Sequence, residues 1–310
     1  MRCSFPRSFP LILIVTLVAT VAACGGERNT SQPANPVSPF APAPVGPTPV
    51  TPDATIVAAG DVGVCGRAEV EATARLLDGI MGPLLGLGDL AYPEGAARDF
   101  ASCYDPFWGR HRGRTRPTPG NHEYQTSNAA PYFEYFGENA GPPGRGYYSY
   151  REGEWLLISL NSNVAADAAS AQAAWLRGKL AAEPAKCTLA YWHHPVFSSG
   201  KHGSNGKMRA LWQILQQAGA EVVLVGHDHI YERFAPQNAD GQSDPQGMRE
   251  FIVGTGGAES EESQASAPNS EVVGNDEGVL RLTLKSDSYA WQFVPIAGRK
   301  FSDAGSAACR

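Results

Sequence analysis

Residues 222–229 read VVLVGHDH, an apolar run that leads through one glycine to two histidines. A short run of Val and Leu without polar alternation is typical of a strand that is buried on both faces. In layered α/β proteins, ligands bind at the carboxyl ends of such strands. This stretch therefore predicts a buried strand whose C-terminal end presents the imidazoles of His227 and His229.

Three other stretches repeat the pattern of an apolar run followed by a metal-binding side chain. They are residues 55–59 before Asp61, residues 84–87 before Asp89, and residues 188–192 before His193. Helices are expected between these runs, at 68–78, at 170–182, and where Met208, Leu211, Trp212 and Leu215 share one face before Gly219. The alternation of strands and helices predicts a layered α/β fold with its functional site at the strand ends.

The remaining patterns extend this fold. Residues 146–149 and 155–160 look like antiparallel strands, and residues 251–253, 279–284 and 289–294 look like a closing meander. Together these elements predict a four-layer α-β-β-α sandwich of two mixed sheets. The Ser- and Glu-rich residues 257–276 predict a mobile surface loop, and Trp155, Trp175, Trp212 and Trp291 are expected in the core.

The N-terminal residues predict export rather than a folded element. Arg2 and Arg7 precede an apolar stretch at residues 11–19, and small residues precede Cys24, so residues 1–23 read as a signal peptide. The sequence before Cys24 resembles a bacterial lipobox, which predicts a lipidated Cys24 and membrane attachment in the cell envelope. The alternative is an ordinary signal peptide. Residues 24–52, rich in Pro and Ala, are expected to be a tether, and residues 53–310 one catalytic domain.

Four cysteines remain after Cys3 and Cys24 are set aside, and in an exported protein they predict two disulfides. Three pairings are possible, and we favour Cys65–Cys103 with Cys187–Cys309. The first pair follows two ligand-bearing segments, and the second would join the C-terminal tail to a central strand. The net charge of −6 becomes −8 when Arg2 and Arg7 are removed. This charge argues against a nucleic-acid-binding surface.

Seven donor side chains occur in an order that is hard to explain by helix caps and turn residues. They are Asp61, Asp89, Tyr92, Asn121, His193, His227 and His229. This set supplies enough ligands for two metal ions. Carboxylate, amide and phenol oxygens beside imidazoles suit iron, manganese or zinc.

The segments GDVG, GDLAY, GNHE, WHHP and GHDH in this order resemble the calcineurin-like metallophosphoesterases, and among them the purple acid phosphatase branch. The resemblance implies that one metal ion is bound by Asp61, Tyr92 and His229, and the other by Asn121, His193 and His227, with Asp89 bridging them. It also implies that His122 and His202 contact the phosphate or the leaving group. For His194 two places remain open, facing the cleft or packing behind it.

The assignment to the purple branch depends on Tyr92. Most of these proteins have a histidine two residues after the first Asp, where this chain has Gly63. Tyr92 replaces that ligand, and an anionic phenolate favours Fe(III), with Fe, Zn or Mn as the second, divalent ion. The implied activity is hydrolysis of small phosphate monoesters, because two ions can neutralise a phosphoryl group and activate water.

Other readings remain open. A phosphodiesterase or a nucleotide hydrolase would use the same metal site, a surface protein could bind a phosphorylated ligand without turnover, and a structural envelope lipoprotein would use no metal. We expect Glu123 to orient His122 through a hydrogen bond. The basic segment RHRGRTR around His111 is expected to be solvated surface.

Overall fold

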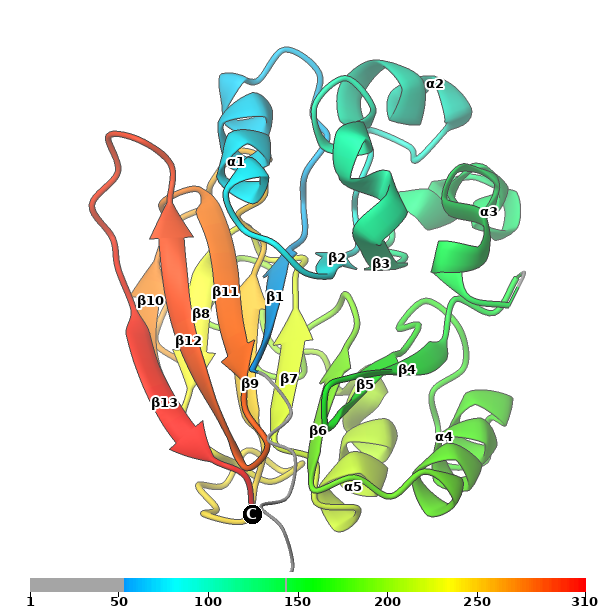
Figure 1. Ribbon diagram of the computed structural model, residues 1–310, viewed down its shortest axis with the longest axis vertical. Coiled ribbons are helices and arrows are strands. Elements are labelled where there is room, and N and C mark those ends of the chain that lie inside the picture. Colours follow the sequence, from blue (N-terminus) through cyan, green and yellow to red (C-terminus); the bar gives the residue numbers. More distant parts are fainter. Residues whose placement is uncertain (1–52, 143) are drawn as a thin grey trace, which may run out of the picture. The chain divides into compact units, whose positions relative to one another are not determined.

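The computed structural model describes residues 53–142 and 144–310, which form two mixed β-sheets with helices outside them (Figure 1). The strands are β1 (Ala54–Ala59), β2 (Leu84–Leu87), β3 (Thr115–Thr118), β4 (Tyr148–Glu152), β5 (Trp155–Ser159), β6 (Cys187–Tyr191), β7 (Val222–Val225), β8 (Tyr231–Phe234), β9 (Arg249–Val253), β10 (Ser270–Gly274), β11 (Gly278–Leu284), β12 (Ser288–Pro295) and β13 (Ala304–Ala308). The helices are α1 (Ala68–Asp78), α2 (Ala97–Asp99), α3 (Ala130–Phe136), α4 (Ala171–Ala182) and α5 (Arg209–Gln217). Shorter 3-10 or π-helical turns lie at Phe100–Tyr104, Trp108–Arg114, Glu123–Gln125, Ser127–Ala129, Gly137–Ala140 and Gly206–Met208.

The expected signal peptide and tether, with Cys24, lie outside the described residues. Within residues 53–142 and 144–310, none of the helices has the length and apolar character needed to cross a membrane.

The sheets place several strand ends along one edge. The first sheet has the order β13-β12-β11-β1-β2-β3, and its strands β1, β2 and β3 are parallel. The second has the order β10-β8-β9-β7-β6-β5-β4, in which β5, β6, β7 and β9 are parallel. Because the carboxyl ends of parallel neighbours meet at one edge, the segments that follow these strands are brought together.

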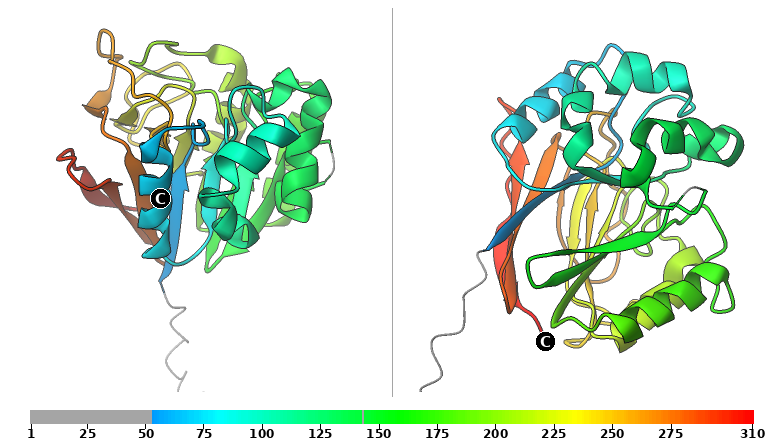
Figure 2. Two further views of the ribbon diagram at one scale, coloured as in Figure 1. Left: turned by 90° about the horizontal axis from the view of Figure 1, so that it is seen from above. Right: turned by 45° about the vertical axis from the view of Figure 1, so that its right-hand side comes forward.

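Each face of the second sheet packs against a different layer. Along β5 and β6, Leu157 and Leu189 belong to the core shared with the first sheet, whereas Leu156 and Ala190 belong to a core shared with α4 and α5. This alternation is the two-residue period of a strand buried on both faces. Figure 1 and Figure 2 show α4 and α5 against the second sheet, and α1, α2 and α3 beside β1, β2 and β3. The predicted sandwich of two mixed sheets is therefore confirmed.

The expected core residues are mostly buried. Trp155, Trp212 and Trp291 have at most 7% of their surface exposed. Trp175 is only half-buried and packs on the ring of Tyr147. On α5, the predicted apolar face is confirmed, because Leu211, Trp212 and Leu215 are all buried.

The prediction that residues 257–276 are a loop is wrong in part. Residues Ser270–Gly274 form β10, which pairs antiparallel with β8. Before that strand, the backbone N–H of Glu261 donates to the carbonyl of His229, and that of Gln264 donates to the carbonyl of Ser199. The segment is therefore fastened to the strand ends beside the histidines.

The basic segment around His111 is also more ordered than expected. The guanidinium of Arg114 donates to the carbonyls of Leu77, Ile80 and Gly82, at and just beyond the C-terminal end of α1. Carbonyls at a helix end lack partners within the helix, so a cation there stabilises the end of the helix. The side chain of His111 is 10% exposed and lies against Asp78 on the same helix. The segment therefore closes α1 rather than standing free in solvent.

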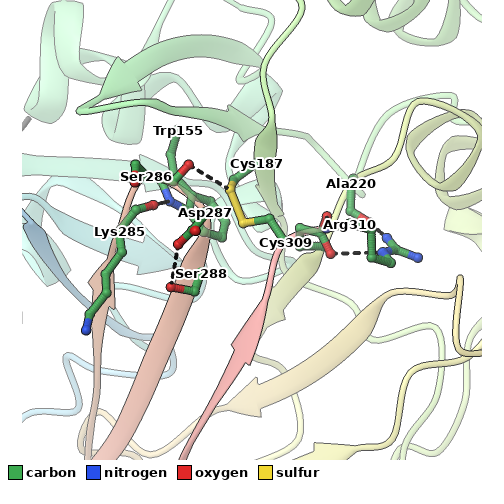
Figure 3. The surroundings of a disulfide bond; sticks show 10 residues. Trp155, Cys187, Ala220, Lys285, Ser286, Asp287, Ser288, Cys309 and Arg310 are labelled. Atoms are coloured by element: carbon green, nitrogen blue, oxygen red, sulfur yellow. Dashed lines mark hydrogen bonds and ion pairs between the residues drawn. A yellow bond between two sulfur atoms is a disulfide. The ribbon is translucent and has the colours of Figure 1, made fainter. Parts of the chain in front are cut away.

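Both favoured disulfides are present. Cys65 pairs with Cys103, and Cys187 pairs with Cys309. Figure 3 shows the second bridge between Cys187, the first residue of β6, and Cys309, just after β13. Beside it, the backbone N–H and the guanidinium of Arg310 donate to the carboxylate of Glu221. The bridge therefore joins the edge strand of the first sheet to the second sheet.

Candidate metal centre

The seven predicted ligands come from segments that follow strands of both sheets. Asp61, Asp89 and Asn121 follow β1, β2 and β3. In the second sheet, His193 follows β6 and His227 follows β7. The parallel neighbours β1-β2-β3 and β6-β7 thus bring side chains that are far apart in sequence to one place.

The glycines beside the ligands are required by close approach. A Cβ on Gly120 would lie 2.1 Å from Oδ1 of Asp89. Gly88 has a φ of +86°, and a Cβ on it would lie 2.5 Å from Nδ1 of His193. Any larger residue at these positions would displace a ligand, which explains why the motifs carry glycine.

One half of the centre is formed by Asp89, Asn121 and His193. Nε2 of His193 lies 3.2 Å from Oδ2 of Asp89 and 3.1 Å from Oδ1 of Asn121. The other ring nitrogen, Nδ1, lies 2.8 Å from the carbonyl of Leu87. Because a carbonyl can only accept, Nδ1 carries a proton and donates it to Leu87, and Nε2 faces the two oxygens. This is how ligating histidines are commonly oriented.

The other half is formed by Asp61, Tyr92 and His229. The hydroxyl of Tyr92 donates to Oδ1 of Asp61 at 3.1 Å and lies 3.2 Å from Nε2 of His229. Nδ1 of His229 lies 2.9 Å from the carbonyl of Glu259, which again leaves Nε2 facing the centre. His227 joins the halves, because its backbone N–H donates to Oδ2 of Asp61 at 2.9 Å.

Burial and the neighbouring charges give these acids unusual ionisation. Burial raises the pKa of Asp61 to about 6, although His193 and His229 oppose it. For Asp89, burial is outweighed by contact with His193 and His122, which holds its pKa below the ordinary range. Burial and the Asp61 carboxylate raise the pKa of the Tyr92 phenol well above its usual value. This phenol can therefore ionise only if positive charge is added beside it.

The imidazoles of the centre differ in their ionisation. Although burial opposes it, contact with the Asp89 carboxylate raises the pKa of His193 to about 9. Burial, together with His193, lowers the pKa of His194 to about 3 and that of His227 to about 2. Neutral imidazole is the form that binds metal ions. Two sets of donor atoms lie within 4.8 Å of one another, namely Asp61, Asp89 and His193, and His193, His194 and His227. Buried carboxylates, a phenol and oriented imidazoles together form a donor set that suits metal cations.

The expected catalytic histidines flank this centre. The backbone N–H of His122 donates to Oδ1 of Asp89 at 2.8 Å, and its ring packs 4.3 Å from the ring of Tyr92. The ring of His202 is exposed and lies 4.4 Å from the ring of His227. The ring of His194 lies beside the centre, 4.5 Å from the ring of His227.

The expected hydrogen bond from Glu123 to His122 is wrong. Glu123 is fully buried, and its carboxylate accepts from backbone N–H groups at 2.7–3.2 Å, which are those of Asp89, Leu90, Ala91 and Gly120. The ring of His122 is instead held through Nδ1, which lies 2.5 Å from the carbonyl of Pro93. Glu123 therefore shapes the loop that carries Asp89.

Sequence reasoning missed Ser162 in the site. Its hydroxyl lies 2.8 Å from Nδ1 of His194 and also accepts from the backbone N–H of that residue at 3.2 Å. Ser162 follows β5. The rule that located the candidate ligands, a polar residue after a buried strand, would therefore also have found Ser162.

The residues that match a known family enclose this whole centre. The calcineurin-like phosphoesterase family matches residues 54–231, which is more than half of the chain, and the chain belongs to this family. Among curated proteins, purple acid phosphatase 15 of Arabidopsis thaliana is 26% identical over 239 residues, covering 65% of this chain and 44% of the relative. Purple acid phosphatase 21 of the same plant is 31% identical over 228 residues, covering 64% and 49%. The expected resemblance to purple acid phosphatases is thus confirmed, over about half the length of those relatives.

Solved structures share the fold. The purple acid phosphatase PPD1 from seeds of yellow lupin, Lupinus luteus, superposes with a TM-score of 0.73 at 16% identity, covering 83% of this chain and 54% of that one. GAP50 of Plasmodium, described as the anchor in the inner membrane complex, gives a TM-score of 0.65 at 13% identity, covering 83% and 89%. At these identities the likeness concerns the fold alone.

Proposed function

We propose that the chain hydrolyses phosphate monoesters at a binuclear centre that holds Fe(III) and a divalent ion, which is Fe, Zn or Mn. The observation that supports this most is the arrangement of Asp61, Asp89 and Tyr92 with imidazoles whose Nε2 atoms face them. Family membership and the purple acid phosphatase relatives point the same way.

Each residue has a separate task in this proposal. Asp61, Tyr92 and His229 would hold the Fe(III), Asn121, His193 and His227 would hold the divalent ion, and Asp89 would serve both. When bound, the two ions neutralise the phosphoryl oxygens and activate the attacking water. Tyr92 serves the trivalent site because its buried phenol, once ionised, adds a negative charge there.

The histidines at the rim handle the phosphate and the leaving group. The ring of His202 is exposed beside His227, so an ester oxygen can approach it from solvent. An imidazole there can protonate the departing alkoxide near neutral pH. His122 is held at Nδ1 by the carbonyl of Pro93 and presents Nε2 toward Asp89 at 3.8 Å. In this proposal it contacts a phosphate oxygen.

Metal analysis combined with two substrates tests the proposal. We expect two metal ions per chain and turnover of 4-nitrophenyl phosphate that exceeds that of bis(4-nitrophenyl) phosphate. Asp89→Asn should lower metal affinity by about 10–100-fold or more, since it removes charge at the shared position. Glu183→Gln is the control, because the side chain of Glu183, the residue that follows α4, forms an ion pair with Lys179.

Three outcomes would overturn the proposal in different ways. Faster turnover of the diester favours the phosphodiesterase or nucleotide hydrolase. Two bound metals with no turnover of either ester favour a protein that binds a phosphorylated ligand without hydrolysing it. GAP50 of Plasmodium, which shares the fold, is described as an anchor. A preparation that binds no metal would support a structural role.

We also propose that the protein is exported and attached to a membrane of the cell envelope through a lipidated Cys24. The two disulfides support an oxidising compartment. Mass spectrometry of the N-terminal peptide should find diacylglycerol on Cys24, and Cys24→Ser should release the protein into the soluble fraction. An unmodified N-terminus produced by cleavage elsewhere would refute the lipid anchor.

A further inference from the structure

Most of the segment between His193 and His202 is buried although it forms no regular secondary structure. Residues 195–200 are all buried, and Lys201 and His202 are exposed directly after them. A buried backbone without a strand or helix must find hydrogen-bond partners for its N–H groups elsewhere. The partners of this segment decide where His202 is held.

Three fully buried carboxylates supply most of these partners. Glu250 on β9 accepts from the backbone N–H groups of Val196 and Phe197 at 3.0 and 3.1 Å. Glu232 on β8 accepts from the backbone N–H of Ser199 at 2.8 Å and from its hydroxyl at 2.5 Å. Successive residues of the segment are therefore fixed by successive acids of the sheet beneath it.

The third acid, Asp228, connects the segment to the metal centre. It stands between His227 and His229, and its Oδ1 accepts from the backbone N–H of His202 at 2.7 Å. Its Oδ2 accepts from the hydroxyl of Ser198 at 2.5 Å. Gly200 packs on this carboxylate so closely that a Cβ would lie 2.3 Å from Cγ of Asp228. Asp228 thus sets the distance between the backbone of His202 and the ligand His227.

None of these acids is paired with a Lys or Arg side chain in the described residues. Within residues 53–142 and 144–310, Glu232 and Glu250 form no ion pair with Lys, Arg or His, and the carboxylate of Asp228 lies within 4.8 Å of a ring nitrogen of His202, whereas Asp303 pairs with Arg233. Burying an acid without a cation is costly, and burial raises the pKa of Glu250 to about 8. Directional N–H and O–H donors offset part of this cost. Such donors fix geometry, and this points to a positional role.

We propose that Asp228, Glu232 and Glu250 are positioning residues that hold the 196–202 segment and thereby place the ring of His202 against His227. This inference rests on the proposed function, in which His202 serves the leaving group. It also explains why an exposed histidine on an irregular segment keeps its ring 4.4 Å from a ligand.

The partners of the three acids differ in a way that makes the proposal testable. Both partners of Glu250 are backbone N–H groups, which can only donate, so the amide of Glu250→Gln must set an NH₂ against one of them. The Oε1 atom of Glu232 accepts only from hydroxyls, those of Ser199 and Ser270, and a hydroxyl can turn to accept from an amide. The same substitution should therefore be disruptive at position 250 and tolerated at position 232.

Hydrogen–deuterium exchange of the metal-loaded protein measures this directly. Glu250→Gln should speed exchange in peptides covering residues 196–202 by about tenfold or more, as expected for a lost buried hydrogen bond. Glu232→Gln, the matched conservative variant, should retain wild-type protection there. Equal exchange in the two variants would overturn the proposal.

Turnover then separates a positioning role from a merely structural one. Glu250→Gln should impair hydrolysis of an alkyl phosphate more than that of 4-nitrophenyl phosphate, whose leaving group needs no proton, with both metals still bound. An equal loss on both substrates would refute the positioning role. If Glu250→Gln does not fold, the pair Asp228→Ala and Asp228→Asn replaces it, because Asn keeps an acceptor for the N–H of His202 and Ala does not. His202→Ala is measured beside whichever pair is used. If it impairs both substrates equally, the proposed role of His202 is refuted, whereas the exchange result still stands.

Discussion

Glu123 offers the sharpest test of how the buried acids support the metal centre. Its two oxygens accept from the backbone N–H groups of Asp89, Leu90, Ala91 and Gly120. Glu123→Gln keeps the shape of the side chain but replaces one oxygen by an NH₂. Each oxygen serves two of the four donors, so two buried N–H groups lose their acceptor in either orientation of the amide.

The expected loss of stability follows from this count. A buried donor left without a partner costs about 1–3 kcal/mol, so two cost about 2–6 kcal/mol of the free energy of unfolding. That is a large part of the roughly 5–15 kcal/mol that stabilises a typical domain. Because Asp89 lies on the loop that Glu123 holds, affinity for the metals should also fall by about 10–100-fold.

Urea unfolding of the metal-free protein and titration with zinc measure the two effects separately. The partly exposed Glu183 provides the control variant Glu183→Gln, which should change stability by about 1 kcal/mol or less. Unchanged stability would refute the hydrogen-bond count. Lost stability with unchanged metal affinity would show that Glu123 supports the fold without shaping the ligand loop.

Three further predictions concern the metal, a disulfide and pH. Iron-loaded protein should be purple or pink through charge transfer from Tyr92, and Tyr92→Phe should abolish the band in the visible spectrum; a colourless wild type would exclude a phenolate ligand. Replacing Cys187 and Cys309 by serines should lower the free energy of unfolding by about 2–4 kcal/mol in urea titrations, since the bridge closes a separation of 122 residues. An unchanged free energy would show that the contact of Arg310 with Glu221 is enough to hold the C-terminal end in place. Although burial opposes it, hydrogen bonding from Arg233 holds the pKa of Asp303 below its usual value. The stability that ionised Asp303 contributes is therefore present above about pH 4 and lost as pH falls through the lowered pKa. Between pH 6 and 3 the free energy of unfolding should depend less on pH in Asp303→Asn than in the wild type, and an equal dependence would exclude Asp303 as a source of acid sensitivity.

Much of the site could be predicted from the sequence because its ligands follow buried strands. Each apolar run that ends at Asp61, Asp89, His193 or His227 carries a local signal, and the strand it predicts is present. The spacing of Asp89 and Tyr92 is likewise local. Export, the tether and the lipid on Cys24 depend on a segment outside the described residues and stay predictions.

The strands without an apolar pattern could not be found in this way. β3 reads TRPT and is a strand because it pairs with β2, and β13 reads AGSAA and is held at the edge by β12 and the Cys187–Cys309 bridge. β10 lies within the Ser- and Glu-rich residues that predicted a loop, and it forms because β8 offers it a free edge. Partners distant in the chain decided these elements.

The roles of the buried acids also belong to the tertiary structure. In the sequence these acids look like ordinary charged residues: Glu123, Asp228, Glu232 and Glu250. The position of Glu123 next to His122 predicts a hydrogen bond to that ring, whereas its partners are backbone N–H groups. Whether an acid can be buried depends on which N–H groups face it, and those groups come from segments that only the packing of the two sheets brings near. The sequence alone determined which side chains are candidate metal ligands, because that information lies in local patterns. The assembled sheets decided how those side chains are held, because hydrogen-bond partners are set by proximity in space.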